Sequence, residues 1–248
     1  MLILLPPSET KQARSRGRSL DLERLSFPEL TRTREQVAQA LATVSASEDA
    51  AGALGVSPGL VDDIARNTRL TSAPALPAQD LYTGVLYDAL DISSLDTPAL
   101  RRARRWIVVV SALYGALRPA DKVAPYRLSM GVNLQGVGPL AGAWREPLDV
   151  VLSAAAGRGA VVDCRSSTYV AAWAPQGALA ERWVQIRVPG ATHMAKHTRG
   201  LLARHLCQAG QDARTPRALE AVAAQAFTTQ LTEPARPGRP WVLDVTAR

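Results

Sequence analysis

The run Trp106-Ile107-Val108-Val109-Val110 decides the fold class of this chain. It is apolar throughout and rich in β-branched residues, which is typical of a strand covered on both faces of its sheet. Ahead of it, Thr97-Pro98 begins a helix that carries an arginine run at 101–105. A helix that leads into a doubly covered strand predicts helices and sheet within one layered domain.

Other segments extend this pattern along the chain. Further strands are predicted at 2–5, 160–164, 183–188 and 241–245, and residues 30–44 have the apolar spacing of a helix. We therefore predict a mixed α/β (α+β) fold. It forms a single compact domain, 1–248, with a central sheet, surrounding helices and a small helix-hairpin-helix element.

Composition excludes several classes of protein. With 248 residues, 47% of them hydrophobic, the chain can bury a core, so disorder is not expected. The apolar stretch 106–117 is shorter than the roughly 20 residues of a membrane-spanning helix, and residues 1–5 lack the basic start of a signal peptide. Cys164 and Cys207 fit no metal or redox spacing. We expect a cytoplasmic protein without membrane association, disulfide or cofactor, and we favour a monomer.

The charge balance favours an anionic partner. A net charge of +7 and a pI near 10.0 suit nucleic acid or phosphorylated molecules. Only three of the 29 basic residues are lysines: Lys11, Lys122 and Lys196. Our hypothesis is that these positions require a compact ammonium group or one that can lose its proton; chance retention is the alternative.

The segment 111–131 is rich in Gly, Pro and Tyr, and it predicts a long functional loop. It gathers Arg118, Lys122 and Arg127 with two phenol groups, a mixture typical of a phosphate- or carboxylate-binding wall. A surface loop with solvated charges is the alternative. The polar loop Ser8-Glu9-Thr10-Lys11 follows the first strand, at a position where ligands often bind.

Residues 53–66 have the outline of a helix-hairpin-helix, with Gly55, Ser57, Pro58 and Gly59 in the hairpin. In nucleic-acid-binding versions of this motif, backbone N–H groups of the hairpin meet a phosphate. A plain tight turn between packed helices is the alternative. Asp62-Asp63 would repel a phosphate close to this helix start.

The late helix, 193–206, offers two kinds of site. His193 and His197 are four residues apart and could share a metal, but no third ligand or HExxH glutamate accompanies them, so we predict no metal site. Lys196 and Arg199 instead suit an anion. For an enzyme, Lys122 or Lys196 would transfer a proton or form a covalent bond, and Asp121 and Asp163 are the acidic candidates.

Four motifs together resemble the YaaA-type peroxide stress proteins: MLILLPPSETK at 1–11, LYTGVLYDAL at 81–90, SALYGALRPADKVAPYRLSMG at 111–131 and MAKHTRGLLARH at 194–205. The resemblance implies a cytosolic mixed α/β protein that limits peroxide damage, lowers unincorporated iron and binds DNA through a positive cleft and a helix-hairpin-helix. The first lysine sits a little earlier here than in some members, and His197 replaces a second lysine. By matching positions, the cleft is lined by Ser8, Thr10, Lys11, Tyr114, Arg118, Lys122, Tyr126, Arg127, Lys196 and Arg199.

Two functions from different classes stay open. The first is a protein that binds DNA without strong sequence preference, because no base-reading module is evident. The second is an enzyme that acts on a small phosphorylated or nucleobase-like substrate in the same cleft. No phosphate-loop, dinucleotide-binding or nucleophile-elbow motif supports the enzyme. Direct iron storage lacks the carboxylate cluster of di-iron proteins.

Overall fold

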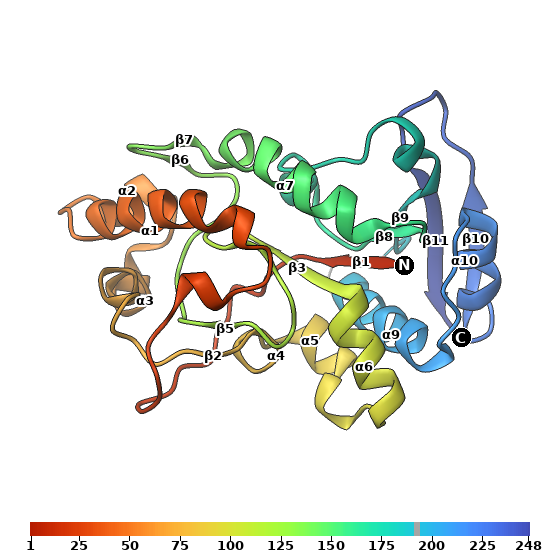
Figure 1. Ribbon diagram of the computed structural model, residues 1–248, viewed down its shortest axis with the longest axis horizontal. Coiled ribbons are helices and arrows are strands. Elements are labelled where there is room, and N and C mark those ends of the chain that lie inside the picture. The colour runs from red at the N-terminus through yellow and green to blue at the C-terminus, as the bar shows by residue number, and fades with distance from the viewer. Residues whose placement is uncertain (191–193) are drawn as a thin grey trace.

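A seven-stranded sheet forms the centre of the molecule (Figure 1). The computed structural model describes residues 1–190 and 194–248. The sheet contains Leu2–Leu5 (β1), Ile107–Ser111 (β3), Gly115–Leu117 (β4), Val161–Asp163 (β8), Trp183–Arg187 (β9), Phe227–Thr232 (β10) and Trp241–Ala247 (β11). Their order is β10-β11-β9-β8-β1-β3-β4, parallel except for β4 and β10 at the two edges. The predicted mixed α/β fold is confirmed.

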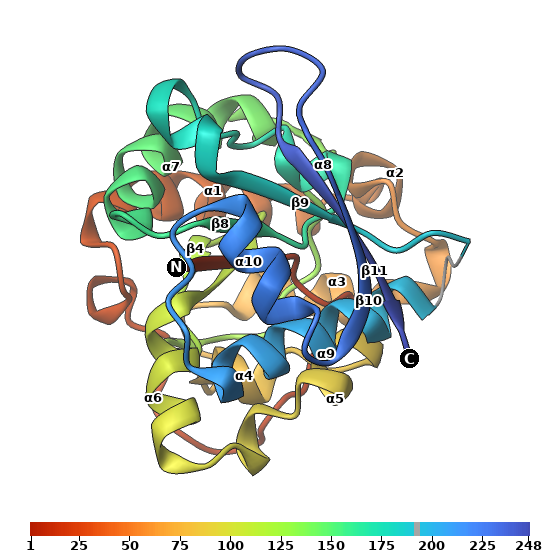
Figure 2. The ribbon, with the colours of Figure 1, turned by 90° about the vertical axis from the view of Figure 1, so that its right-hand side faces the viewer.

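Helices cover both faces of this sheet (Figure 1). Helix α7 (Leu140–Ala156) lies on one side, and α5 (Val85–Leu90), α6 (Thr97–Trp106) and α9 (Met194–Ala209) pack together on the other. Figure 2 shows α10 (Pro216–Ala223) beside β10 and β11. Because the inner strands are covered on both faces, β1, β3 and β8 are buried along their whole length. Trp106 is the last residue of α6 rather than the first residue of the strand.

Smaller elements lie beyond the carboxyl ends of β1 and β3 (Figure 1). They comprise α1 (Thr31–Ser45), α2 (Ala50–Leu54), α3 (Val61–Arg66), the β2/β5 pair (Leu76–Pro77 and Lys122–Val123) and the β6/β7 pair (Asn133–Leu134 and Gly138–Pro139). Helix α4 (Ala78–Leu81) packs against β2 and β5, and its Gln79 N–H donates to the carbonyl of Pro119. Helix α8 (Ser167–Val170) follows β8. These elements place polar loops next to the sheet edge, where the site is found.

The 53–66 segment contains the last two residues of α2, a turn, a 3-10 helix at Pro58–Leu60 and α3. The hydroxyl of Ser57 accepts the N–H of Gly59 at 3.4 Å, so Ser57 caps the second half as expected. Gly55 follows the last residue of α2. The helix-hairpin-helix and its binding of nucleic acid both stay predictions. In the described residues, no helix combines the length and the apolar character needed to cross a membrane.

Helices α5 and α9 approach each other so closely at Gly200 that a side chain there would overlap the carbonyl oxygen of Leu86. We expect Gly200→Ala to lower the free energy of unfolding by about 1–3 kcal/mol through overpacking, measured by urea denaturation. Gly142, exposed on α7 with open space around its Cα, is the matched control. Gly142→Ala should stabilise the protein by up to about 1 kcal/mol. Equal effects of the two changes would contradict close packing at Gly200.

Candidate functional site

The carboxyl ends of β1, β3, β8 and β9 meet at one edge of the sheet. The chain leaves β1 for β3 on one side and later returns to β8 on the other side of β1. Ligands of open α/β sheets bind at such a switch point, outside the carboxyl ends of the strands. This topology directs attention to the loops that follow β1, β3 and β8.

Lys11 lies in the loop after β1, where Pro6-Pro7 end the strand. Its Nζ donates to the carbonyl oxygens of Ser8 at 2.7 Å and Glu9 at 3.3 Å. The same Nζ lies 4.4 Å from the centre of the Tyr126 ring. The backbone of Lys11 bridges to Tyr82, so the loop is tied to the start of α5. The ammonium group is therefore held in one place by backbone and aromatic partners.

Burial and, to a smaller extent, the positive charge of Arg127 lower the pKa of Lys11 to about 7. Glu9 and Asp63 raise this pKa, and Arg66 lowers it. A lysine with a pKa near neutrality exchanges its proton readily at cellular pH, which is the property required of a proton-transfer or nucleophilic amine.

Hydroxyl groups form a buried chain beside Lys11. The Tyr126 and Ser111 hydroxyls are 2.7 Å apart, and those of Tyr126 and Tyr82 are 3.2 Å apart. The backbone N–H of Tyr114 donates to the Ser111 hydroxyl at 3.1 Å. Burial raises the pKa of Tyr82 and of Tyr126 well above the usual value, so both phenols stay neutral at physiological pH.

The glycine of the LYG motif turns the chain from β3 into β4. Gly115 has φ +70°, and a side chain there would overlap the Trp144 ring. The turn places the Tyr114 ring edge-on to Tyr126, with centroids 5.3 Å apart, and the Tyr114 hydroxyl donates to the carbonyl of Ala124 at 2.9 Å. Tyr114 therefore supports Tyr126 rather than facing a ligand.

Arg127 is positioned by the segment that follows α3. The buried amide of Asn67 donates to the Arg127 carbonyl at 2.9 Å and accepts the Arg127 N–H at 2.8 Å. Its guanidinium pairs with Glu9 at 3.4 Å, and the Glu9 side chain is 83% exposed. Because such an exposed pair is worth little, a phosphate group can displace Glu9 from Arg127.

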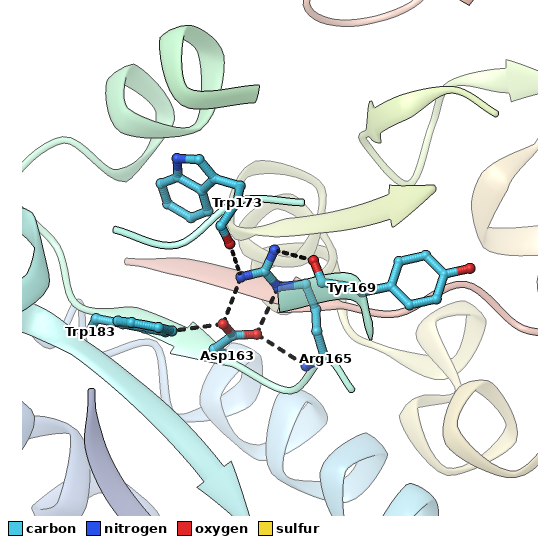
Figure 3. A network of polar contacts seen from close by, with 5 residues as sticks. All are labelled: Asp163, Arg165, Tyr169, Trp173 and Trp183. Carbon is cyan, nitrogen blue, oxygen red and sulfur yellow. Dashed lines mark hydrogen bonds and ion pairs between the residues drawn. The ribbon is translucent and has the colours of Figure 1, made fainter. Parts of the chain in front are cut away.

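A buried ion pair holds the loop after β8 (Figure 3). Arg165 donates to both carboxylate oxygens of Asp163, at 2.8 and 2.7 Å, and the Trp183 indole donates to Asp163 at 3.0 Å. Arg165 also donates to the carbonyls of Tyr169 and Trp173. These bonds fix α8, and Figure 3 shows the Tyr169 ring pointing away from the ion pair.

Tyr169 lies close to Glu9 and Arg127. Burial raises the pKa of Tyr169 to about 12, a hydrogen bond from the Met130 backbone lowers it, and the charges of Glu9 and Arg127 are felt there with opposite signs. Sequence reasoning missed Tyr169, as it missed Tyr82, Ser111 and Asn67. The sequence features that could have indicated these site residues are the tyrosines of the LYTGVLYDAL motif and of the turn after β8.

The late helix contributes Arg199 to this edge of the sheet. Its guanidinium donates to the Ile186 carbonyl at 3.1 Å, while its Nε is buried with no hydrogen-bond partner in the described part of the chain. Burial raises the pKa of the neighbouring Cys164 thiol to about 12, although Arg199 lowers it. Lys196 is exposed and His197 is partly exposed on α9. His193 lies outside the described residues, so the histidine pair has no described geometry.

Three other residues predicted for the site lie elsewhere. Arg118 donates to the carbonyls of Arg105 and Ile107, at the amino end of β3, about 13 Å along the strand from Ser111. Asp121 accepts the Arg118 N–H at 2.7 Å and two bonds from Ser26. Lys122 is exposed on β5.

Of the predicted cleft residues, the structure thus brings together Ser8, Thr10, Lys11, Tyr126 and Arg127, with Tyr114 packed against Tyr126 and Arg199 at the same edge of the sheet. Asp163 is occupied by Arg165, as described above. In residues 1–190 and 194–248, no three His, Cys, Asp or Glu side chains are grouped as metal ligands.

A cavity of about 280 Å³ is lined in part by Tyr82 and Tyr87. It is lined by the carboxylates of Asp80, Asp88 and Asp91 as well as by apolar groups. Negative walls repel an anion, so the basic groups around Lys11 form the better site for a phosphate.

The chain is similar to a family of known proteins. The model of the family described as peroxide stress protein YaaA matches residues 1–232. The chain belongs to the YaaA peroxide stress protein family. Membership in this family confirms the predicted resemblance and supports a role in peroxide stress.

Several bacterial relatives are similar to this chain over nearly the same length. A UPF0246 protein of Streptomyces coelicolor is 46% identical over 254 residues, covering 99% of this chain and 98% of that protein. A UPF0246 protein of Corynebacterium efficiens is 40% identical over 223 residues, covering 87% and 88%. One of Corynebacterium glutamicum is 35% identical over 234 residues, covering 91% and 93%.

Proposed function

We propose that this chain is a cytoplasmic peroxide stress protection protein that binds DNA without strong sequence preference. The binding surface comprises the basic cleft around Lys11 and the 53–66 segment. The proposal includes the lower level of free iron that the YaaA resemblance implies for the cell. The proposal concerns what the protein binds. Its membership in the peroxide stress family follows from the comparison above.

One observation carries the proposal: the 53–66 segment lies beside the basic residues Lys11 and Arg127. The charges of Asp63 and Arg66, on α3, act on the ammonium group of Lys11. Asn67, directly after α3, binds both backbone polar groups of Arg127. A phosphate chain that crosses α3 would therefore meet Lys11, Arg66 and Arg127 together.

The charge distribution suits backbone contacts with DNA. Arg66 pairs with Asp63 at 2.9 Å, which offsets part of the repulsion predicted from the two aspartates of α3. The net charge of +7 adds long-range attraction that salt screens. Contacts of this type position a duplex but read no bases, so we expect weak sequence preference.

An enzyme acting on a small phosphorylated or nucleobase-like substrate is the second candidate. It is favoured by the pKa of Lys11, which is lowered to about 7 by burial, because passive phosphate binding does not require a proton-exchanging amine. Binding of phosphorylated metabolites without binding of DNA would favour this enzyme over the DNA-binding protein.

Fluorescence anisotropy with labelled duplex and single-stranded DNA, at several salt concentrations, tests the proposal. We expect Arg127→Ala to weaken binding several-fold and to reduce the salt slope by about one unit, because one phosphate contact is lost. The backbone bonds of residue 127 to Asn67 survive this change, so the fold should be retained.

Arg217→Ala is the matched control for this titration. Arg217 is 75% exposed and pairs with Glu233 on the far edge of the sheet. The Arg217→Ala variant should keep the DNA affinity and the salt slope of the original protein. Absence of DNA binding by the original protein at low salt would overturn the proposal, and an unchanged slope for Arg127→Ala would remove Arg127 from the contact surface.

A further inference from the structure

We infer that Lys11 forms an imine with the aldehyde of a phosphorylated sugar, and that an abasic site in DNA is the favoured source of this aldehyde. The inference rests on the proposed function for that choice of source. A deoxyribose that has lost its base exposes an aldehyde at C1′ when its ring opens, and it carries a phosphate on each side. The same chemistry is present in free 2-deoxyribose 5-phosphate.

The hydrogen bonds of Lys11 orient its amine for attack. In the neutral amine, two N–H groups donate to the carbonyls of Ser8 and Glu9. The nitrogen lone pair then points away from both carbonyls. Lys11 is partly exposed and Thr10 beside it is exposed, so the lone pair can be reached by a ligand. An amine that served only to pair with a carboxylate would not need this backbone cradle.

The aromatic partner of Lys11 suits a cationic product. The Tyr126 ring centre lies 4.4 Å from Nζ, within the range in which a ring face stabilises a cation. An imine that forms at Nζ is protonated to an iminium ion, and its positive charge would lie over this ring. The bonds of Tyr126 to Ser111 and Tyr82 keep the ring in place.

A phosphate next to the aldehyde has a partner in Arg127. This guanidinium is close enough to lower the pKa of Lys11, and its only described carboxylate partner, Glu9, is highly exposed. Arg127 would hold the sugar phosphate while the aldehyde reaches Lys11. The site therefore selects phosphorylated sugars over neutral aldehydes.

The covalent step is a condensation that needs no oxidant or reductant. The lone pair of Nζ attacks the aldehyde carbon C1′, and the carbonyl oxygen takes up a proton to give a carbinolamine. Loss of that oxygen as water leaves the C1′=N bond of the imine. Hydrolysis reverses both steps, so the capture is reversible.

Reductive trapping with sodium cyanoborohydride tests the inference on the full chain. We incubate the protein with a duplex that contains one abasic site, with the same duplex carrying a tetrahydrofuran analogue that lacks the aldehyde, and with 2-deoxyribose 5-phosphate. A covalent adduct is expected with the abasic duplex and none with the analogue. Because the chain has three lysines, Lys11, Lys122 and Lys196, peptide mass mapping assigns the adduct, which is expected on Lys11.

Lys11→Arg separates binding from capture. The guanidinium of arginine cannot form an imine, so the adduct should fall at least tenfold, roughly to background. Anisotropy measures the DNA affinity of the same variant, and the loss of adduct should exceed any loss of affinity. If Lys11→Arg does not fold, peptide mass mapping of the adduct on the original protein still shows whether Lys11 is the modified residue. An adduct on Lys122, on Lys196 or on the N-terminal amine instead of Lys11 overturns the inference.

The trapping and binding results together distinguish failure of this inference from failure of the proposed function. DNA binding without any adduct from either sugar overturns the inference and leaves the proposed function standing. An adduct from 2-deoxyribose 5-phosphate without DNA binding supports imine formation by Lys11, overturns the DNA source and favours a small-molecule enzyme. Adducts from both sugars support the inference, and the more efficient one identifies the preferred source.

The pH dependence of the trapping rate distinguishes a lysine with a lowered pKa from a lysine that is merely close to the aldehyde. With a pKa of about 7, about one tenth of Lys11 is neutral at pH 6 and about nine tenths at pH 8. The groups that face it are Glu9, Asp63, Arg66, Arg127 and the neutral phenols of Tyr82 and Tyr126. The initial trapping rate should therefore rise between pH 6 and pH 8 and level off. A rate that keeps rising tenfold per pH unit above pH 8 contradicts a perturbed Lys11.

Discussion

We expect Arg165→Ala to lower the free energy of unfolding by about 3–5 kcal/mol, because it leaves a buried carboxylate without its partner. The Asp163 and Arg165 side chains are both 0% exposed, and their nearest nitrogen and oxygen atoms are 2.7 Å apart. After the change, Asp163 keeps only the Trp183 indole and the backbone N–H of residue 165 as donors. Urea denaturation followed by circular dichroism measures the loss.

The matched control is a salt bridge of the same type at the surface. Arg217 and Glu233 are 2.8 Å apart, with side chains 75% and 67% exposed. Arg217→Ala should change the free energy of unfolding by less than about 1 kcal/mol, since water screens an exposed pair. Replacing both buried partners, as Asp163→Leu with Arg165→Met, should cost less than Arg165→Ala alone. Equal losses for Arg165→Ala and Arg217→Ala would contradict an uncompensated buried charge.

Arg165→Ala should also affect the candidate site around Lys11. Arg165 binds the carbonyls of Tyr169 and Trp173, so its removal frees α8 and the Tyr169 ring, which lies close to Glu9 and Arg127. The sequence reasoning that made Asp163 an acidic catalytic candidate used its position at a strand end. That position is right, but the sequence does not reveal that the side chain two residues later folds back on Asp163.

The strands were predictable because burial on both faces leaves a direct trace in the sequence. The runs at β1, β3 and β8 are apolar and bounded by Pro or polar residues, so their location follows from hydrophobic content alone. The strand β10 escaped prediction, because its FTTQLT pattern alternates exposed and buried residues at an edge of the sheet.

The site was predictable in its loops but not in its geometry. Lys11 and Arg127 lie together because the chain returns to the carboxyl edge after β5. Arg118 is only nine positions before Arg127 in the sequence, yet it binds Ile107 at the opposite end of β3. The pKa of Lys11 depends on burial beside Tyr126, a residue from a distant part of the chain, which no local pattern records.

Arg34→Met should lower the free energy of unfolding by about 3 kcal/mol or more, because four backbone carbonyls lose a charged donor inside the protein. Arg34 is fully buried in α1 and donates to the carbonyls of Ser26, Phe27, Tyr114 and Ala116 at 2.7 to 3.2 Å. Burial lowers the pKa of Arg34 to about 10, so the side chain still carries its charge at neutral pH.

The control for Arg34 lies on the same helix. Arg32 is exposed, and Arg32→Met should change the free energy of unfolding by no more than about 0.5 kcal/mol in urea denaturation. Arg34→Lys should recover little of the loss, because a lysine cannot present the planar set of donors that reaches four carbonyls. Full recovery by Arg34→Lys would show that charge alone is needed. Since Arg34 binds Tyr114 and Ala116 on both sides of Gly115, its loss should also loosen the turn that supports Tyr126 beneath Lys11.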